Sequence, residues 1–515
     1  MNRIASPAPL LPEILALHGK WRAGKEALVC GDQRLTWGAF IRRCNQVANG
    51  LLALGLGRGD RVVVLMCNSP EMVEVLFGIM TAGCVSVPLN LAVDDRALAA
   101  MIDDCAPGAV ICSADQLSRL QHRRGDGICY ITCGPAPAGW QQYDQLFASQ
   151  PDTAPAVDIG DDDLLNIIYS SGTTGLPKGI AHTFRGRRDW AYDLAVALRY
   201  HGGARTLVTI GLYSNISWVA MLTTLLAGGT LVVQRRFEVA DFWRDLEEER
   251  ITHTAMVPIQ YQRILDYPAL AEVDTSRMQS LMSCGSPLHE GLKRRLFEVF
   301  TCGIIELYGL TEGIITTLEP EEVEGHWQSV GKPLIGTDIA ILDDKDRCLA
   351  AGESGEIVSR GRITMPCYFN RPEATEEVRW VDGEGRQWLR SGDIGYLDQE
   401  GYLYIVDRKK DMILSGGQNI YPQDIEAVLI EHPEVDDVAV IAAPSQRWGE
   451  TPIALVVPRG GHLEDIAGLL AWCNARVGRQ QRIADLIVVS ELPRNPNGKI
   501  LKRELRKSHG QQTYP

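Results

Sequence analysis

Apolar residues in the first part of the chain follow two periods, and these periods alternate. From 35 to 54 they recur every three or four positions, the spacing of a helix, and Thr36 could cap its start. The mainly apolar segments 61–65 and 85–89 are typical of buried strands, and a helical segment from 68 to about 83 lies between them. Strands that alternate with helices predict an α/β fold with a mainly parallel sheet.

The same alternation continues beyond a Pro-, Ala- and Gln-rich connection at 135–160. A helix is expected from Trp218 to Leu226, ended by Gly228 and Gly229. Further strands are expected at 164–168, 206–210 and 231–233, and at the starts of 251–258, 281–288 and 304–313. These segments extend the predicted set of mixed, mainly parallel sheets with helices.

The pattern changes near the C-terminus. Short alternating runs split by Asp and Gly turns fill 331–368 and predict a small antiparallel sheet or β-barrel-like subdomain. The charged stretch 409–411 separates two ordered patterns and is a candidate domain boundary. We therefore expect a large domain at 1–408 and a small α+β domain at 409–515.

Composition describes a soluble globular protein of two or three domains. The chain has 515 residues, of which 45% are hydrophobic and 23% charged, with a net charge of −14. That charge argues against nucleic acid as a partner and weakly against an anionic membrane surface, because both attract clustered Lys and Arg. The local basic clusters at 235–236 and 408–410 could still meet a phosphorylated cofactor.

The cysteines and the N-terminus point to the cytoplasm. The 13 cysteines are odd in number and scattered, which favours reduced, mostly buried thiols. The first residues lack an apolar core of signal-peptide length, and no apolar run approaches the ~20 residues of a spanning helix. We expect a cytoplasmic protein without a membrane span.

The segment from Tyr169 to Gly179, YSSGTTGLPKG, carries the strongest chemical signal. It follows an expected strand, and its glycines let the backbone approach a ligand closely. Bent backbone amides, hydroxyls and a lysine can together surround phosphate oxygens. These groups are Ser170, Ser171, Gly172, Thr173, Thr174, Gly175 and Lys178. The alternative is a polar turn without a ligand. The segment is not a Walker A loop, because Pro177 and Gly179 flank the lysine.

SGTTGLPKG, from Ser171 to Gly179, resembles the signature of the adenylate-forming superfamily. That superfamily includes acyl-CoA synthetases, aryl-CoA ligases, luciferases and the adenylation domains of peptide synthetases. Further blocks similar to the family's follow in the expected order along nearly the whole chain. The resemblance implies two half-reactions: a carboxylate attacks the α-phosphorus of ATP to give an acyl-adenylate and pyrophosphate, and a thiol then displaces AMP.

The block from Tyr308 to Gly313 matches the family's Tyr-Gly-x-Thr-Glu. A carboxylate beside a triphosphate is repelled unless a cation lies between them, so Glu312 is expected to bind Mg²⁺. Tyr308 offers a flat face to adenine, Gly309 allows close approach, and Thr311 offers a hydroxyl to phosphate. The alternative for Glu312 is an exposed turn residue.

The resemblance assigns further ATP-binding residues. It implies that Gly285, Ser286 and Pro287 line the adenine side of the site. It also implies that Asp393 accepts hydrogen bonds from the ribose hydroxyls and that Arg408, at the end of the large domain, binds the nucleotide as well. Lys499, in a Pro-x-x-x-x-Gly-Lys ending, is expected to contact the carboxylate and the α-phosphate. The alternative for that residue is a solvated surface lysine.

The C-terminal domain resembles the family's rotating lid. Lys410 falls at the hinge position, and Gly416 and Gly417 are expected to shape the pantetheine channel after the lid turns. Trp448 is expected to border the CoA nucleotide, with a structural role as the alternative. The segment 479–482 lacks the proline of the family's usual Lys-x-Pro element, so the CoA surface is expected to differ.

The resemblance also marks the acyl pocket. Gly211 and Ser214 stand where the family usually has Pro-x-x-His. The expected pocket positions are Tyr213, Ser214, Asn215, Ile216, Val257, Cys284, Gly309 and Ile314. They are mostly apolar and include no cation for a second carboxylate, so an aryl or medium aliphatic acid is expected.

Together these patterns predict an acyl-CoA ligase (AMP-forming) that uses ATP, Mg²⁺ and coenzyme A on a small carboxylic acid. Two alternatives remain. The acceptor could be the phosphopantetheine of a carrier protein, or the chain could bind nucleotide without catalysis. Family habit favours a monomer or homodimer.

Overall fold

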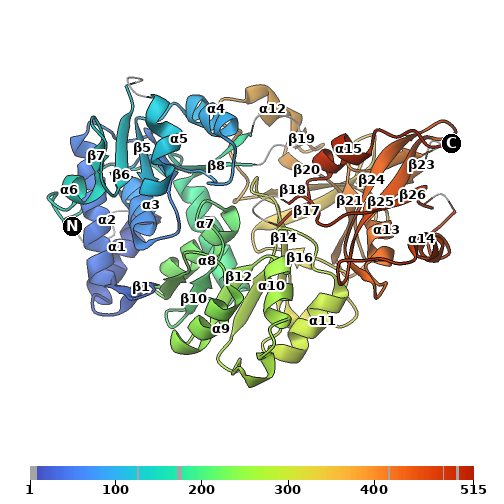
Figure 1. The fold of residues 1–515 in the computed structure, drawn as a ribbon. Helices are drawn as coiled ribbons and strands as arrows, with labels where there is room; N and C mark the ends of the chain where they lie inside the picture. The colour runs from blue at the N-terminus through green and yellow to red at the C-terminus, as the bar shows by residue number, and fades with distance from the viewer. Residues whose placement is uncertain (1–7, 124–126, 171–176, 416–417, 480, 495–497) are drawn as a thin grey trace. The chain divides into compact units, whose positions relative to one another are not determined.

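The computed structural model describes residues 8–123, 127–170, 177–415, 418–479, 481–494 and 498–515 (Figure 1). The chain divides into two compact units. The first unit comprises 1–321, 333–338 and 360–389, and the second comprises 322–332, 339–359 and 390–515. The second unit includes part of the small β-sheet region as well as the C-terminal segment, and the domain bounds 1–408 and 409–515 stay a prediction.

The first unit contains a seven-stranded sheet of order β7-β6-β5-β3-β4-β8-β9. All neighbouring strands are parallel except β9, which is antiparallel to β8. The strands are β3 (Arg61–Leu65), β4 (Val85–Pro88), β5 (Ala109–Ser113), β6 (Cys129–Cys133), β7 (Gln141–Gln142), β8 (Leu164–Tyr169) and β9 (Gly179–Thr183). The expected strand–helix alternation is therefore confirmed here.

A nine-stranded sheet follows the order β16-β15-β14-β13-β12-β10-β11-β1-β2. Its parallel centre is flanked by the antiparallel pairs β14–β15 and β1–β2. The strands are β1 (Glu26–Cys30), β2 (Gln33–Thr36), β10 (Arg205–Val208), β11 (Thr230–Val233), β12 (His253–Met256), β13 (Ser280–Ser283), β14 (Ile305–Gly309), β15 (Ile315–Leu318) and β16 (Lys332–Pro333).

Helices cover both sheets, and one core joins them. Buried side chains of α2, α3 and α8 pack with Val62 and Val64 of β3 and with Leu231 and Val233 of β11. Thr36 caps α2 as expected, its Oγ1 accepting from the amide of Ala39 at 3.3 Å. The helices are α1 (Leu11–Trp21), α2 (Trp37–Ala53), α3 (Pro70–Thr81), α4 (Asp95–Cys105), α5 (Leu117–Leu120), α6 (Tyr143–Phe147), α7 (Phe184–Ala197), α8 (Asn215–Leu226), α9 (Val239–Glu248), α10 (Pro258–Leu265), α11 (Glu290–Val299) and α12 (Pro372–Glu377).

A five-stranded sheet occupies the region where a small antiparallel sheet was expected. Its order is β17-β18-β20-β19, with β21 also paired to β20. The strands are β17 (Thr337–Leu342), β18 (Gly355–Gly361), β19 (Arg379–Val381), β20 (Gln387–Leu397) and β21 (Leu403–Arg408). The antiparallel pairings of β20 with β19 and β21 agree with the alternating pattern of the sequence.

The C-terminal part of the second unit is the expected α+β structure. Its sheet has the order β23-β22-β25-β24, and β26 pairs with β25. Successive residues of β24 enter cores on opposite faces, as Val440 and Ile441 illustrate. The elements are β22 (Ile413–Ser415), β23 (Gln418–Ile420), α13 (Pro422–Leu429), β24 (Val435–Ser445), β25 (Gly449–Pro458), α14 (Ile466–Asn474), β26 (Asp485–Val488) and α15 (Lys502–His509).

No helix in the described ranges is both long enough and apolar enough to cross a bilayer.

Candidate active site

The hydroxyl-rich loop joins β8 to β9. The amide of Ser170 donates to the carbonyl of Lys178 at 3.0 Å and closes the loop at its base. This geometry matches the expected strand–loop arrangement. Five of the expected phosphate ligands lie outside the described residues: Ser171, Gly172, Thr173, Thr174 and Gly175. Their roles stay predictions.

Tyr368 links Lys178 to Glu312. Its hydroxyl donates to Oε1 of Glu312 at 2.9 Å, and the Lys178 ammonium lies 4.8 Å from the centre of its ring. Burial, followed by the charge of Glu312, raises the pKa of the Tyr368 hydroxyl, so it stays a hydrogen-bond donor at neutral pH. One aromatic side chain thus brings together the cation and the carboxylate expected to bind the triphosphate.

Sequence reasoning missed Tyr368. The tyrosine is brought into place because the amide of Phe369 donates to the carbonyl of Gly179 at 2.7 Å, and that of Ala181 to Cys367 at 3.1 Å. This pairing lays 367–369 against β9, far earlier in the chain. No local pattern around Tyr368 carries that information.

Glu312 sits in the tight turn between β14 and β15. The amide of Leu310 donates to the carbonyl of Ile314 at 3.0 Å, and that of Gly313 to Leu310 at 3.1 Å. A Cβ on Gly309 would lie 2.5 Å from the Ile314 carbonyl oxygen, so this position requires glycine. The turn holds Thr311 and Glu312 half-buried at the end of the strand that carries Tyr308.

The Gly285–Ser286–Pro287 turn follows β13, the neighbour of β14. Gly285 has a φ of +92°, a conformation that favours glycine. The amide of Leu288 donates to Oε1 of Glu306 at 3.4 Å, and Oε2 of Glu306 lies 2.6 Å from the Lys293 ammonium. A buried ion pair therefore ties this turn to the strand of Tyr308.

The remaining expected pocket positions gather at the same edge of the nine-stranded sheet. Because β10, β12, β13 and β14 are consecutive neighbours and parallel, the segments after them meet at their carboxyl ends. These segments carry Tyr213, Ser214, Asn215, Ile216, Val257, Cys284 and Ile314. Cys284 is buried, which raises its pKa to about 12, so its thiol stays neutral.

Ser214, which replaces the family's usual histidine, has a structural role in this fold. It is buried, and its Oγ accepts from the amide of Ile216 at 3.3 Å to cap α8. The substitution therefore stabilises the helix start at this edge of the pocket.

In the second unit, Asp393 and Arg408 face each other across β20 and β21. Their Cα atoms are partners in the antiparallel register, and Nε of Arg408 lies 2.9 Å from Oδ1 of Asp393. Asp393 is only 2% exposed. The carboxylate expected to bind ribose is thus oriented and neutralised by the arginine on the neighbouring strand.

Lys499 lies close enough to Asp393 and Arg408 for their charges to affect its pKa. Burial, followed by the charges of Arg408 and Lys410, lowers the pKa of Lys499 to about 8, although Asp393 and Asp411 oppose the shift. Asp411 forms an ion pair with Arg506, in which Oδ1 of Asp411 lies 2.7 Å from Nη2 of Arg506. The expected hinge lysine and the expected catalytic lysine therefore belong to one charged cluster within the second unit. Beside it lies a cavity of about 360 Å³ lined by Ser391, Gly392, Arg408, Lys409 and Lys410.

The expected CoA residues are only partly described. Trp448 is 47% exposed, and the guanidinium of Arg447 lies 4.7 Å from its ring centre. An exposed ring at the β24–β25 turn is free to stack on a ligand, which a core tryptophan is not. Gly416 and Gly417 lie outside the described residues.

The described residues fit a Mg²⁺ ion bound by a single protein carboxylate rather than by a cluster of protein ligands. In the part of the chain that the structure describes, no group of three or more His, Cys, Asp or Glu side chains could hold an ion. Mg²⁺ typically takes one or two protein carboxylates together with phosphate oxygens and waters. Glu312, with one carboxylate oxygen engaged by Tyr368, fits that donor set.

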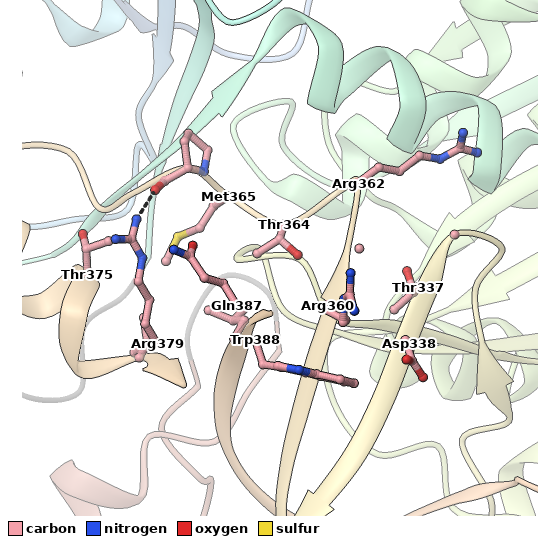
Figure 2. A pocket seen from close by; sticks show the side chains of 15 residues that line it. Thr337, Asp338, Arg360, Arg362, Thr364, Met365, Thr375, Arg379, Gln387 and Trp388 are labelled. Atoms are coloured by element: carbon pink, nitrogen blue, oxygen red, sulfur yellow. Dashed lines mark hydrogen bonds between the residues drawn. The ribbon is translucent and has the colours of Figure 1, made fainter. Parts of the chain in front are cut away.

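A cavity of about 870 Å³ in the first unit contains none of the expected site residues (Figure 2). Three arginines line it, but two of them are engaged in structural bonds. Arg362 pairs with Asp193, and Nη2 of Arg379 donates to the Pro366 carbonyl at 3.1 Å. Its wall adjoins the turn of Glu312, because the amide of the lining residue Met365 donates to the Glu312 carbonyl at 2.8 Å.

The chain is similar to known proteins over nearly its whole length. The family model of AMP-binding enzymes covers residues 18–369, and that of the AMP-binding enzyme C-terminal domain covers 424–499. Long-chain-fatty-acid–CoA ligase FadD13 of Mycobacterium tuberculosis is 33% identical over 483 residues, 93% of this chain and 94% of that protein. Feruloyl-CoA synthase of an Amycolatopsis species is 34% identical, covering 93% and 95%. The structure of ATP-bound MatB from Rhodopseudomonas palustris matches with a TM-score of 0.88 and 27% identity, covering 97% of this chain and 99% of that one.

Proposed function

The chain belongs to the family of AMP-binding enzymes, and from that premise we propose that it is an AMP-forming ligase that joins a carboxylic acid to coenzyme A. The observation that carries this proposal is similarity to CoA ligases over almost the full length of both proteins. The enzyme activates the acid with ATP and then transfers the acyl group to the CoA thiol.

In the first step a carboxylate oxygen of the acid attacks the α-phosphorus of ATP. The new P–O bond forms as the bond to the β-phosphate breaks, so acyl-adenylate and pyrophosphate result. No protein nucleophile is required, and catalysis consists of positioning anions and stabilising phosphate charge. We assign this task to the hydroxyl loop, Lys178, Thr311 and Glu312. Tyr368 supports the assignment because it fixes one oxygen of Glu312 and faces Lys178.

Glu312 is the residue that would hold a magnesium ion. When bound, the ion would supply positive charge to the phosphate oxygens. Tyr308 and the Gly285–Pro287 turn are proposed to hold the adenine. The buried Glu306–Lys293 pair supports this assignment, since it fixes both segments at the ends of neighbouring strands.

Lys499 is proposed to meet the attacking carboxylate and the α-phosphate. A lysine ammonium suits this role because it is a mobile point charge with three donors. The position of Lys499 among Asp393, Arg408 and Lys410 supports the proposal, since Asp393 is the expected ribose ligand. We propose that rotation about Lys410 then exchanges Lys499 for the CoA-binding residues Gly416, Gly417 and Trp448.

In the second step the CoA thiol gives up its proton, and its sulfur attacks the acyl carbonyl carbon. The C–S bond forms, the C–O bond to AMP breaks, and thioester and AMP are released. For the acid we propose an aryl or medium aliphatic class. Support comes from the buried apolar side chains at three of the expected pocket positions, Ile216, Val257 and Ile314.

The deciding experiment measures ATP–pyrophosphate exchange over a panel of aryl and aliphatic acids, followed by AMP release with CoA or with a holo-carrier protein. We expect exchange with at least one acid and AMP release with CoA. AMP release with the holo-carrier protein but not with CoA would show that the acceptor is the carrier's phosphopantetheine. ATP binding without exchange on any acid would instead identify a non-catalytic nucleotide-binding protein.

A further inference from the structure

Arg187 is a buried cation behind the expected acyl pocket. It lies on α7 and is 1% exposed. Its Nε donates to Oδ1 of Asn166 on β8 at 3.0 Å, and its Nη2 donates to Oδ1 of Asn215, the first residue of α8, at 2.9 Å. The guanidinium carbon lies 4.7 and 5.4 Å from the ring centres of Trp190 and Trp218.

No carboxylate neutralises this guanidinium within the described residues, where both of its hydrogen-bond acceptors are neutral amides. Burying an unpaired charge is costly, and two aromatic faces offset only part of that cost. Burial lowers the pKa of Arg187 to about 9, so the side chain still carries its charge at neutral pH. A cation kept at this cost needs an explanation other than packing.

Two buried polar atoms of neighbouring side chains also lack a hydrogen-bond partner within the described ranges. Nδ2 of Asn166 and Nε2 of His182 are buried without a hydrogen-bond partner in the part of the chain described here. Burial, and then the charge of Arg187, hold the pKa of His182 far below its usual value, so His182 adds no second charge. The cluster therefore combines a buried cation with buried polar atoms that have no partner among the described residues, and native structures leave few such groups unexplained.

Asn215 connects Arg187 to the expected pocket, because it accepts a hydrogen bond from Arg187 and is itself one of the expected pocket positions. A guanidinium can only donate, so the Asn215 oxygen must face Arg187 and the Nδ2 amino group must occupy the other branch of the amide. Asn215 is partly exposed, whereas Arg187 is enclosed. Asn215 also follows Ser214, which caps α8 at the edge where the expected pocket positions gather. The bond to Arg187 thus fixes the orientation of the Asn215 amide and leaves Nδ2 as the donor available to a ligand.

We propose that Asn215, oriented by Arg187, donates from Nδ2 to an oxygen acceptor on the acid, at the end remote from the reacting carboxylate. The inference rests on the proposed function and narrows its substrate class. The preferred acids are aryl or medium aliphatic acids that carry a hydroxyl, carbonyl or second carboxylate oxygen. Arg187 is a positioning residue here, and Asn215 is the specificity residue that touches the substrate.

The test compares acids that differ by one acceptor group. Cinnamate is paired with 4-hydroxycinnamate, and hexanoate with adipate, and kcat/KM for acyl-adenylate formation is measured for each. A site built to hydrogen-bond a substrate oxygen discriminates strongly against the analogue that lacks it. We expect a preference of about tenfold or more for the oxygen-bearing member of at least one pair. A preference for 4-hydroxycinnamate would indicate a neutral hydroxyl as the acceptor, and a preference for adipate would indicate a second carboxylate.

The variants Asn215→Leu and Arg187→Met should reduce that preference to about one, mainly through the KM of the oxygen-bearing acid. The preference is a ratio, so a lower fraction of folded enzyme does not change it. Thr223→Val is the matched control: it removes a buried hydroxyl from the same helix, one that bonds the Val219 carbonyl at 2.6 Å, and should leave the ratio unchanged.

Two results would overturn the inference while the proposed function stands: equal use of both members of each pair by the wild type, or an unchanged preference in both variants. Absence of exchange with every acid would overturn the proposed function itself.

Discussion

The hydroxyl of Tyr368 donates to Oε1 of Glu312 at 2.9 Å, and the same ring faces the ammonium of Lys178 at 4.8 Å. The tyrosine comes from a segment paired to β9, while the glutamate comes from the turn after β14. Because a hydrogen bond to a charged group is stronger than a neutral one, this contact fixes the orientation of the carboxylate.

Tyr368→Phe removes that hydrogen bond and keeps the ring beside Lys178. Loss of a hydrogen bond to a charged acceptor costs roughly 1.5–3 kcal/mol, so we expect adenylation kcat/KM to fall about tenfold or more. The Mg²⁺ concentration for half-maximal pyrophosphate exchange should rise, because Glu312 is less well oriented. Tyr368→Leu, which also removes the ring, should lose more. An unchanged Mg²⁺ dependence in Tyr368→Phe would mean that the hydroxyl serves only the fold.

Lys499→Ala should separate the two half-reactions. If Lys499 stabilises only the adenylation step, exchange should fall by at least about a hundredfold. Thioester formation from supplied acyl-adenylate should stay within a few-fold of the wild type. Stopped assays of each half-reaction measure both. Comparable losses in the two steps would contradict the rotating-lid assignment.

The pH profile of adenylation should show a basic limb near pH 8. The pKa of Lys499 is lowered to about 8 by burial and by Arg408 and Lys410, and only the protonated form can pair with anions. The charged fraction is therefore high below pH 8 and declines as pH rises through that value, and kcat/KM should decline with it. In Lys499→Arg the guanidinium keeps its proton, so the residual activity should lack this limb. A limb that persists in that variant would have to be assigned to another group.

The Glu306–Lys293 ion pair makes a prediction about stability. Its atoms lie 2.6 Å apart, and both side chains are almost fully buried. Removing one partner leaves an uncompensated buried charge, so Glu306→Leu should lower the free energy of unfolding by about 3–5 kcal/mol. The double variant Glu306→Leu with Lys293→Met should recover much of that loss, because no charge then stays buried. Denaturant titration of the wild type, the two single variants and the double variant completes a double-mutant cycle. If the losses in free energy of unfolding add, the two charges do not interact.

Much of the fold followed from local patterns in the sequence. The helix cap at Thr36, the strand–helix alternation and the antiparallel segment after residue 331 depend on short-range periodicity and turn residues, which a sequence displays directly. The block around Glu312 could also be found, since its glycines and acid lie within one turn.

Tyr368 and Arg187 could not be found in this way. Tyr368 reaches Glu312 only because 367–369 pairs with a distant strand. Arg187 lies in the polar sequence Arg185-Gly-Arg-Arg188, which is typical of an exposed helix face, yet tertiary packing encloses its side chain. The expectation that the pocket positions include no cation for a second carboxylate considered only those positions, whereas the proposed role of Arg187 is exerted through its hydrogen bond to Asn215.

The pairing of Asp393 with Arg408 bears on the proposed role of Asp393 as the ribose ligand. A bare carboxylate at the sugar end of a polyanion such as ATP would push the ligand away. Since the arginine across the strand cancels that charge, Asp393 can offer acceptor oxygens without electrostatic repulsion. Discrimination at this position would then depend on the presence of hydroxyls on the sugar, and it should vary little with ionic strength.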